Sequence, residues 1–221
     1  MIGEDIRAKV FRNTNDFYKT FPAGAVSEHL VAFTRRFAGM DVLDFGCAAG
    51  NYCVRLAQLG YNMKGVDVNA EYVRMAREKG VDAHVVTDKA PFADRSFDTV
   101  LVYEVVEHLP DPSKVILEAK RLARKNVLFT TPHSGEIAEL QSHGLLLEHF
   151  ADLDHKNFFD EASLSDLLKP YFSRVTVWKG DGINPFVLFT FRPIRWMGRL
   201  LIMLRLLKPR YHFRLYAVAE V

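Results

Sequence analysis

The stretch VLDFGCAAGNYC (42–53) decides the fold of this chain, because it joins an aliphatic run to a helical segment through a turn of small residues. The aliphatic run ends at Asp44. Four of the next six residues are small, namely Gly46, Ala48, Ala49 and Gly50. Such a turn lets a ligand touch the backbone, and the helix that follows offers unpaired N–H groups in its first turn. The pattern predicts a strand, a ligand-binding turn and a helix over 51–59.

The composition is that of a soluble globular domain: 221 residues, 49% hydrophobic and 25% charged. The formal net charge of +2 creates no overall field that favours nucleic acid or another acidic partner. Cys47 and Cys53 are the two cysteines; they form no disulfide framework and favour a reduced, cytoplasmic setting. The N-terminus MIGEDIRAKVFRNTND lacks the apolar core of a signal peptide, and no run of about eighteen apolar residues could span a bilayer.

Strand and helix patterns alternate along the first 130 residues. Short apolar, β-branched runs predict strands at 41–45, 62–66, 82–86, 97–103 and 126–130. Segments with helical spacing lie between them, at 51–59, 70–80 and 112–125. Asn69 is a candidate N-cap for the second of these helices. The alternation predicts an α/β fold, a doubly wound parallel sheet with helices on both faces.

Beyond residue 130 the alternation loosens. The sequence predicts an irregular, histidine-rich segment, then a helix over 161–172 and strands at 174–180 and 214–221. No internal repeat or linker interrupts the chain. We therefore expect one domain over 1–221, with an N-terminal helical segment 1–39 and an insertion 183–212 between the last two strands.

A second feature extends the ligand prediction. Asp67 ends the second expected strand, 21 residues after Gly46. An acid at about this distance from the turn accepts hydrogen bonds from both hydroxyls of a ribose, since a carboxylate offers two acceptors to two donors. The turn alone could serve packing, but the turn with the acid predicts a nucleoside-containing cofactor, either a dinucleotide or S-adenosylmethionine.

The motifs resemble those of class I S-adenosylmethionine-dependent methyltransferases. VLDFGCAAG resembles the family's D-x-G-x-G-x-G motif, with Asp44, Gly46, Ala48 and Gly50 in its four positions and Ala where the third is usually Gly. APFADRSFDTVLVYEVVEHLPDP (90–112) is similar to the block found in small-molecule enzymes of the ubiquinone-biosynthesis type, the methyltransferase type 11 group. NVLFTTPHS and NFFDEASLSDLLKPYF resemble later motifs of the same group. The resemblance covers roughly residues 40–180.

The resemblance implies a Rossmann-like seven-stranded sheet whose last strand is antiparallel, with S-adenosyl-L-methionine as cofactor and S-adenosyl-L-homocysteine as product. It implies that the backbone at Gly46, Cys47 and Ala48 passes close to the methionine part, that Gly50 belongs to the same turn, and that Asp44 lies near the amino group. Cys47 is expected to pack rather than to act as a nucleophile.

Four further positions carry cofactor roles by the same resemblance. Asp67 would hold the ribose hydroxyls, and Val68 would pack on the adenine. Asp88 is the candidate acceptor for the adenine amino group. Tyr103, at the end of the fourth strand, would border the methionine chain.

Methyl transfer from a sulfonium needs positioning and exclusion of water, and it needs a general base only when the acceptor proton is hard to remove. For a hydroxyl acceptor, His133 and His108 are the candidate bases. His143, His149 and His155 lie in the same region. A solvated polar loop is the simpler explanation for each of the five, and no ligand spacing predicts a metal site.

The segment FRPIRWMGRLLIMLRLLKPR (191–210) combines arginines at helical spacing with Trp196 and many leucines. Cationic residues with Trp and Leu are typical of a helix in a membrane interface, and such a location would favour a lipid-linked acceptor. The alternatives are an insertion helix packed on the domain or on a partner chain, or a lid over the acceptor pocket.

We expect a small-molecule methyltransferase that acts on oxygen, and no residue of the sequence excludes transfer to nitrogen or to carbon instead. A nucleic-acid enzyme is disfavoured because the base-holding Asn/Asp-Pro-Pro-aromatic motif is absent after the fourth strand, so no nucleic-acid partner is expected. A non-catalytic docking module that retains the fold is a further alternative, and Asp44 disfavours an NAD-dependent oxidoreductase. We expect the residues that line the acceptor pocket to come from three segments, 16–21, 131–158 and 183–210. The sequence identifies neither the acceptor nor the oligomeric state.

Overall fold

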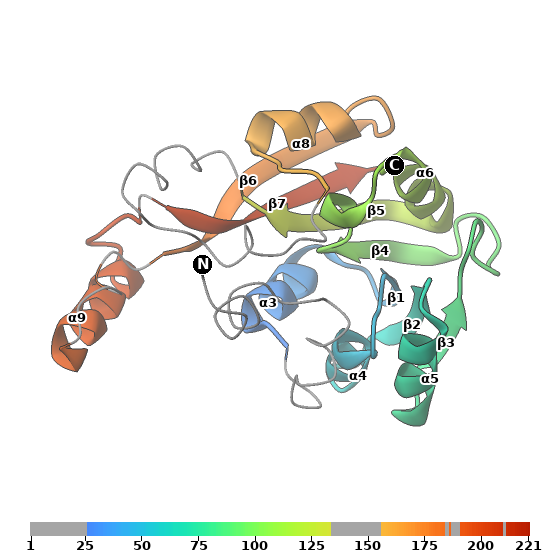
Figure 1. The fold of residues 1–221 in the computed structure, drawn as a ribbon, viewed down its shortest axis with the longest axis horizontal. Helices are drawn as coiled ribbons and strands as arrows, with labels where there is room; N and C mark the ends of the chain where they lie inside the picture. Colours follow the sequence, from blue (N-terminus) through green and yellow to red (C-terminus); the bar gives the residue numbers. More distant parts are fainter. Residues whose placement is uncertain (1–25, 134–155, 184–185, 187–190, 210) are drawn as a thin grey trace, which may run out of the picture.

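A single mixed sheet organises the chain (Figure 1). The computed structural model describes residues 26–133, 156–183, 186, 191–209 and 211–221. The strands are β1 (Asp41–Phe45), β2 (Asn62–Asp67), β3 (Asp82–Val85), β4 (Phe97–Tyr103), β5 (Ala123–Pro132), β6 (Arg174–Gly182) and β7 (His212–Glu220). The helices are α3 (Glu28–Phe37), α4 (Asn51–Ala57), α5 (Ala70–Glu78), α6 (Ser113–Leu122), α8 (Glu161–Leu168) and α9 (Arg192–Met203), with a short 3₁₀ turn η1 (Val106–His108).

The strand order is β3-β2-β1-β4-β5-β7-β6. β1 to β5 pair in parallel, and β7 is antiparallel to both of its neighbours, β5 and β6. The predicted α/β fold with an antiparallel last strand is confirmed. The chain moves outward from β1 to β3 and then returns to β4 on the other side of β1. A ligand site is therefore expected beyond the carboxyl ends of β1 and β4, where the strand order reverses.

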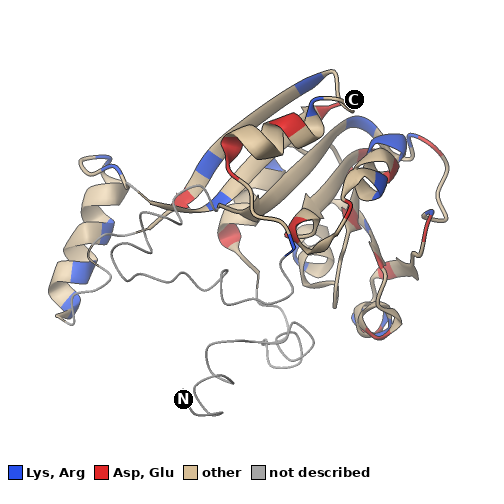
Figure 2. Cartoon of the chain, turned by 45° about the horizontal axis from the view of Figure 1, so that its top comes forward, with Lys and Arg blue, Asp and Glu red and all other residues tan. Residues whose placement is uncertain are grey.

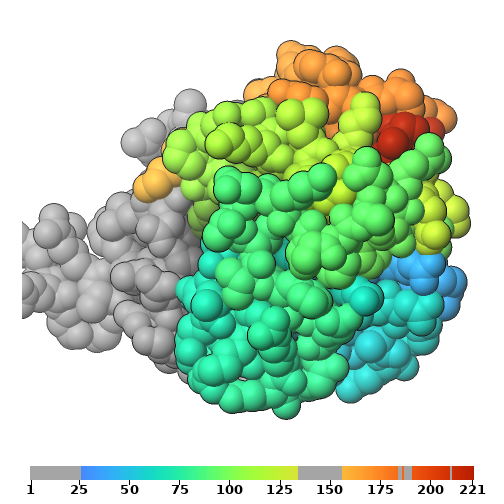
Figure 3. Space-filling view, turned by 90° about the vertical axis from the view of Figure 1, so that its right-hand side faces the viewer, coloured from blue at the N-terminus to red at the C-terminus, as the bar shows by residue number. Residues whose placement is uncertain are grey.

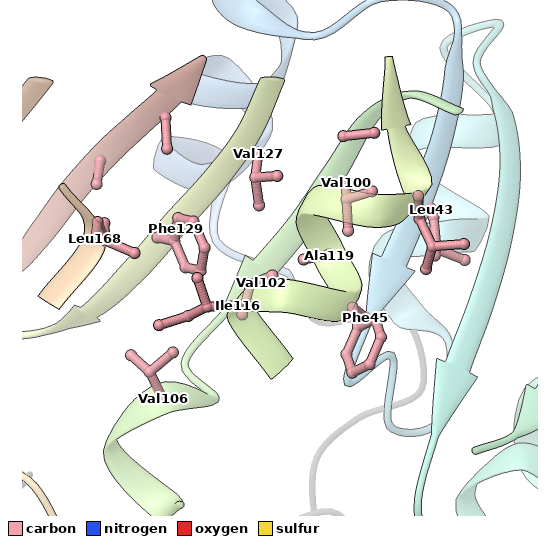
Figure 4. Close-up of a cluster of buried hydrophobic side chains, with 14 of the residues drawn as sticks. Leu43, Phe45, Val100, Val102, Val106, Ile116, Ala119, Val127, Phe129 and Leu168 are labelled. Atoms are coloured by element: carbon pink, nitrogen blue, oxygen red, sulfur yellow. The ribbon is translucent and has the colours of Figure 1, made fainter. Parts of the chain in front are cut away.

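Both faces of the sheet are covered, so consecutive residues of a strand pack into hydrophobic cores on opposite sides of the sheet. On one face, α6 and α8 cover the sheet; Figure 4 shows Ile116 and Ala119 of α6 against Val100 and Val102 of β4. On the other face, α3 packs on residues such as Leu101 and Leu128.

The edge of the sheet at β2 and β3 is covered by α4 and α5. The Asn69 side chain caps α5 by accepting from the N–H groups of Glu71 and Tyr72, as its position before the helix predicts. Figure 3 shows this side of the molecule, where the segments around α5 and α6 form one continuous surface with α8 above them.

The boundary between α6 and β5 differs from the prediction. Helical spacing predicts a helix to residue 125, but α6 ends at Leu122 and Ala123 is already extended. Arg124 and Lys125 form ion pairs with Asp41 and Asp98, at distances of 2.5 Å and 3.0 Å. These pairs tie the chain to the amino ends of β1 and β4, and β5 therefore starts three residues earlier than its apolar run.

The insertion between β6 and β7 contains α9, which stands apart from the helices and strands of the sheet (Figure 1). Pro193 occupies the start of α9, where a missing N–H costs little. Among the described residues, no helix combines the length and the apolar composition that crossing a bilayer requires.

Candidate active site

The turn after β1 has a backbone conformation that explains its small residues. Gly46 and Gly50 have φ angles of +91° and +74°, in the left-handed region that glycine tolerates best. The N–H groups of Gly46 and Cys47 both donate to the carbonyl oxygen of Val66, at 2.8 Å and 3.0 Å. A Cβ atom at Gly46 would lie 2.6 Å from Cγ2 of Val105, so no side chain fits there. The turn is thus held close to β2 and to the segment after β4.

Ala48 occupies the third motif position with a φ angle of +44°. A Cβ atom in this region costs about 1–2 kcal/mol, which explains why glycine is usual there. The Ala48 N–H donates to Oδ2 of Asp67 at 2.9 Å. This hydrogen bond joins the turn to the end of β2.

Asp67 lies at the end of β2 with 9% of its surface exposed. Its Oδ1 accepts from the N–H of Asn69 at 2.8 Å, and its Oδ2 accepts from Ala48. Burial raises the pKa of the Asp67 carboxyl, and the backbone N–H groups that it accepts oppose the rise. A carboxylate can accept about four hydrogen bonds, and the backbone N–H groups of Ala48, Val68 and Asn69 use part of that capacity. The hydroxyls of a ribose are donors that fit the capacity that remains.

Asp44 is the most deeply placed acid of the turn, with 3% exposure. The Cys53 thiol donates to its Oδ2 at 3.6 Å. Burial raises the pKa of the Asp44 carboxyl from 3.8 to about 7; the Cys53 thiol opposes this rise, and the Asp67 charge adds to it. Within the described part of the chain, no Lys, Arg or His forms an ion pair with Asp44. A buried carboxylate without a cation fits a ligand that brings its own positive charge, such as an amino group.

The register of the sheet brings Asp44, the turn and Asp67 to one edge, because Asp44 pairs with Gly65 and Asp67 follows two residues later. Val68 is adjacent and 74% exposed, so its side chain has a free surface on which a ring could pack. Asp88 is exposed and lies three residues beyond Val85, the β3 partner of Asp67. Val68 and Asp88 therefore follow strands that end at the same edge.

Tyr103 ends β4 beside this edge, but its side chain is directed into the core. It is 7% exposed, its hydroxyl pairs with Oγ1 of Thr34 at 2.9 Å, and its ring meets the ring of Tyr52 edge-on at 6.2 Å. Burial raises the pKa of Tyr103 well above its ordinary value, so its hydroxyl stays protonated. Tyr103 supports α3 and α4 beneath the turn.

Cys47 and Cys53 are both buried and both free thiols. A Cβ atom at Gly65 would lie 2.7 Å from the Cys47 sulfur and 3.4 Å from the Cys53 sulfur. The two sulfurs therefore occupy the space that the glycine leaves on β2, which is a packing role.

The two candidate bases follow neighbouring strands. His108 closes η1 after β4 and is half-buried, while His133 follows β5 and is 3% exposed. The Thr131 hydroxyl donates to Oε2 of Glu107 at 3.2 Å, and this hydrogen bond links the segment that carries His108 to the one that carries His133. His143, His149 and His155 lie outside the described residues, as do 16–21 and 134–155 of the expected acceptor region. No group of three potential metal ligands occurs in the residues that the structure describes.

A charged network on the same edge was missed by the sequence analysis. Arg214, at the start of β7, donates to Oε1 of Glu104 at 3.0 Å and pairs with Asp181 of β6. The Tyr216 hydroxyl donates to Oδ1 of Asp181 at 2.8 Å. In the sequence, Arg214 is the one residue that points to this network, because it is the only charged residue among the apolar residues that open the last strand. Nothing in the sequence identifies its two partners.

A model of the methyltransferase-domain family matches residues 17–171, more than half of the chain. A ubiquinone biosynthesis O-methyltransferase from Ralstonia nicotianae is 32% identical over 117 residues, which cover 48% of this chain and 49% of that protein. One from Xanthomonas oryzae pv. oryzae is 36% identical over 95 residues, which cover 39% of this chain and 40% of that protein. The matched segment thus spans about half or less of the length of these relatives.

Solved structures support the fold. A SAM-dependent methyltransferase from Archaeoglobus fulgidus superposes with a TM-score of 0.65 at 19% identity, over 95% of this chain and all of that one. Magnesium protoporphyrin IX methyltransferase from Synechocystis, solved with bound S-adenosylhomocysteine, gives a TM-score of 0.59 at 16% identity, over 99% of this chain and all of that one. With the family match over 17–171, the chain belongs to the methyltransferase-domain family, the class I enzymes whose methyl donor is S-adenosylmethionine.

Proposed function

We propose that this chain transfers a methyl group from S-adenosylmethionine to a hydroxyl oxygen of a small-molecule acceptor, and that the acceptor is lipid-linked. The observation that carries the proposal is the pair of buried carboxylates, Asp44 and Asp67, on either side of a turn without bulky side chains. The relatives from Ralstonia and Xanthomonas, whose names describe O-methyltransferases, favour oxygen as the acceptor atom. The exposed apolar residues of α9 favour a lipid-linked molecule.

Each residue of the site has a distinct task in this proposal. When bound, the cofactor supplies a methyl group on a sulfonium, which is already a good electrophile. Asp67 accepts from the two ribose hydroxyls while its own contacts to Ala48 and Asn69 keep the carboxylate in place. Asp44 balances the charge of the amino group. Val68 covers one side of the adenine, and Asp88 accepts from its exocyclic amino group.

The acceptor hydroxyl must lose a proton as its oxygen gains the methyl group. His108 or His133 accepts that proton and later releases it to water, so the imidazole returns to its starting state. Of the two, His108 is the more exposed in this structure. The rest of the acceleration comes from holding the acceptor oxygen in line with the methyl group and from excluding water.

The test begins with calorimetric titration of the chain with S-adenosylhomocysteine. We expect micromolar affinity for the wild type and at least about tenfold weaker binding for Asp67→Ala, because two charge-assisted hydrogen bonds are lost. Asp82→Ala is the matched control, since Asp82 is an exposed carboxylate on β3 that pairs with Lys64. Thermal melting of each variant separates lost binding from lost folding. A wild type that does not bind S-adenosylhomocysteine would overturn the proposal.

A second measurement addresses the acceptor. The chain is incubated with S-adenosylmethionine carrying an isotopically labelled methyl group and with matched phenols that have or lack a prenyl chain. We expect labelled methyl ethers, identified by mass spectrometry, with a preference for the prenylated phenols. Transfer to amines alone would refute the choice of oxygen, and equal rates for both sets of phenols would refute the lipid link.

A further inference from the structure

Helix α9 differs from every other described helix in its surroundings. It lies between β6 and β7, and Figures 1 and 2 both show it projecting away from the sheet and from the helices that cover the sheet. A helix that packs on its own domain buries one face against it, as α3 buries Leu30, Val31 and Phe33. Within α9, Gly198 is the one buried residue.

The surface of this segment is unusually apolar. Thirteen large hydrophobic residues are exposed in the described part of the chain, and six of them lie within 191–206. These six are Phe191, Trp196, Met197, Met203, Leu204 and Leu206, with exposed fractions of 64%, 69%, 48%, 71%, 54% and 72%. A concentration of exposed apolar side chains in one short segment is typical of a surface that contacts something apolar.

The charges of the same segment are all positive. From Gly182 to Ala219 the sequence has no acidic residue. Arg192 and Arg199 of α9 and Arg205 and Lys208 after it are exposed, and Figure 2 shows the positive bands along the helix. The whole chain carries a formal net charge of only +2, so the positive charge is concentrated here.

The arginines of α9 and three of its apolar side chains lie on opposite sides of the helix, while Ile202 and Met203 fall on the arginine side. At about 100° per residue, Arg192, Arg195 and Arg199 share one side of the helix, and Ile194, Met197 and Leu201 share the opposite side. Trp196 falls at the border between the two sides. A basic face, an apolar face and a tryptophan at their border are the features of a helix that lies in the plane of a membrane surface.

We propose that α9 lies on the surface of a bilayer that contains anionic lipids. The apolar side enters the boundary between headgroups and acyl chains, and the arginines face the anionic headgroups. Charge complementarity favours this occupant over a second copy of the chain, because two copies of a segment without acidic residues would repel each other. The consequence for the acceptor rests on the proposed function: a lipid-linked acceptor would reach the active site from the same bilayer.

The proposal is tested by sedimentation of the protein with vesicles, which requires no cofactor or acceptor. Vesicles of phosphatidylcholine alone are compared with vesicles of phosphatidylcholine mixed with phosphatidylglycerol. We expect binding to the mixed vesicles and at least about 30-fold weaker binding by the Arg192→Glu/Arg199→Glu variant, given the attraction of each basic side chain to an anionic surface. The Lys114→Glu/Lys169→Glu variant changes the net charge equally at exposed sites, one on α6 and one directly after α8, and we expect it to bind as the wild type does.

The apolar side is tested separately with Trp196→Ala. We expect weaker binding to the mixed vesicles, while Leu117→Ala, which removes a 52% exposed leucine from α6, leaves binding unchanged. Thermal melting shows whether each variant is folded.

Three results would overturn the membrane proposal. One is equal binding of the wild type to the two kinds of vesicle. Another is an equal loss of vesicle binding in the two double variants. The third is a wild type that binds no vesicles but forms a dimer that Trp196→Ala dissociates, which would make α9 an interface between copies. Failure to methylate any of the phenols, prenylated or not, with vesicle binding intact, would count against the proposed function alone.

Discussion

Replacing Asp44 by Asn is expected to stabilise the cofactor-free protein and to weaken cofactor binding. Asp44 is 3% exposed, and burial raises the pKa of its carboxyl from 3.8 to about 7. Between these two pH values the folded chain keeps a proton that the unfolded chain has lost. The free energy of unfolding therefore falls as the pH rises through this range, and above pH 7 the ionised carboxylate costs the fold about 4 kcal/mol. Asparagine has nearly the same shape and no charge, so it removes this cost.

Urea unfolding of the wild type and of Asp44→Asn between about pH 4 and about pH 9 measures the effect. The advantage of the variant in free energy of unfolding should grow by about 1.4 kcal/mol per pH unit and level off above pH 7. Asp82→Asn is the control, because the hydrogen bond from Lys64 lowers the pKa of this exposed acid and its stabilising effect is lost as the pH falls. If Asp44→Asn were less stable than the wild type at pH 8, or equally shifted at every pH, the reasoning about its burial would be refuted.

The same variant tests what the buried charge is for. If Asp44 balances the amino group of the cofactor, Asp44→Asn should bind S-adenosylhomocysteine at least about tenfold more weakly at pH 8. Binding by the wild type should release a proton near pH 6, because the amino group draws the carboxylate into its ionised form. Calorimetry in two buffers with different heats of ionisation counts that proton. Unchanged affinity would mean that Asp44 does not contact the cofactor.

Three further substitutions probe the turn, the buried acid after β4 and the start of α8. Gly46→Ala should lower the free energy of unfolding by about 2–4 kcal/mol in urea unfolding, because it adds a contact of 2.6 Å with Val105 to a left-handed backbone. Gly60 has a φ of +95° and open space around it, so Gly60→Ala should show only the cost of the left-handed backbone. Glu107→Gln should unfold at higher urea than the wild type at pH 8 and lose this advantage toward pH 5, because burial raises the pKa of Glu107 well above its ordinary value; a pH-independent difference would contradict this. Asp160→Ala should lower the thermal midpoint by the equivalent of about 1 kcal/mol, because it removes the N-cap of α8, and an unchanged midpoint would show that the cap contributes nothing.

The backbone of the turn and the place of Asp67 in the fold could be predicted because they depend on short-range rules. Gly46 and Gly50 are required by their positive φ angles. The length of one strand–helix–strand unit sets the distance along the chain from the turn to Asp67 at the end of β2. The parallel sheet then places the ends of β1 and β2 together whatever the remaining residues are. The burial of Asp44 could not be predicted in the same way, because an acid at the end of a strand is exposed unless neighbouring segments cover it.

The charged network after β4 and the end of α6 depend on contacts between distant parts of the chain. Glu104, Asp181 and Arg214 meet although 110 residues separate the first from the last. The end of α6 likewise depends on ion pairs with β1 and β4 rather than on its own helical spacing. Pattern and propensity describe neighbours along the chain, so they miss interactions of this kind.

The departures from local preference are concentrated on one edge of the sheet. Five described residues other than glycine have a positive φ, and three of them, Ala48, Glu104 and Asp181, lie at the carboxyl ends of β1, β4 and β6. Each conformation costs about 1–2 kcal/mol, and the same edge carries the buried acids Asp44 and Glu107. These costs persist only where the surrounding core can support them, as the packed strands and helices beneath this edge do. The edge thus combines strained backbone with buried acids, and a bound cation or hydrogen-bond donor would offset part of their cost. This is why a variant that makes the cofactor-free protein more stable at Asp44 should make it a poorer binder.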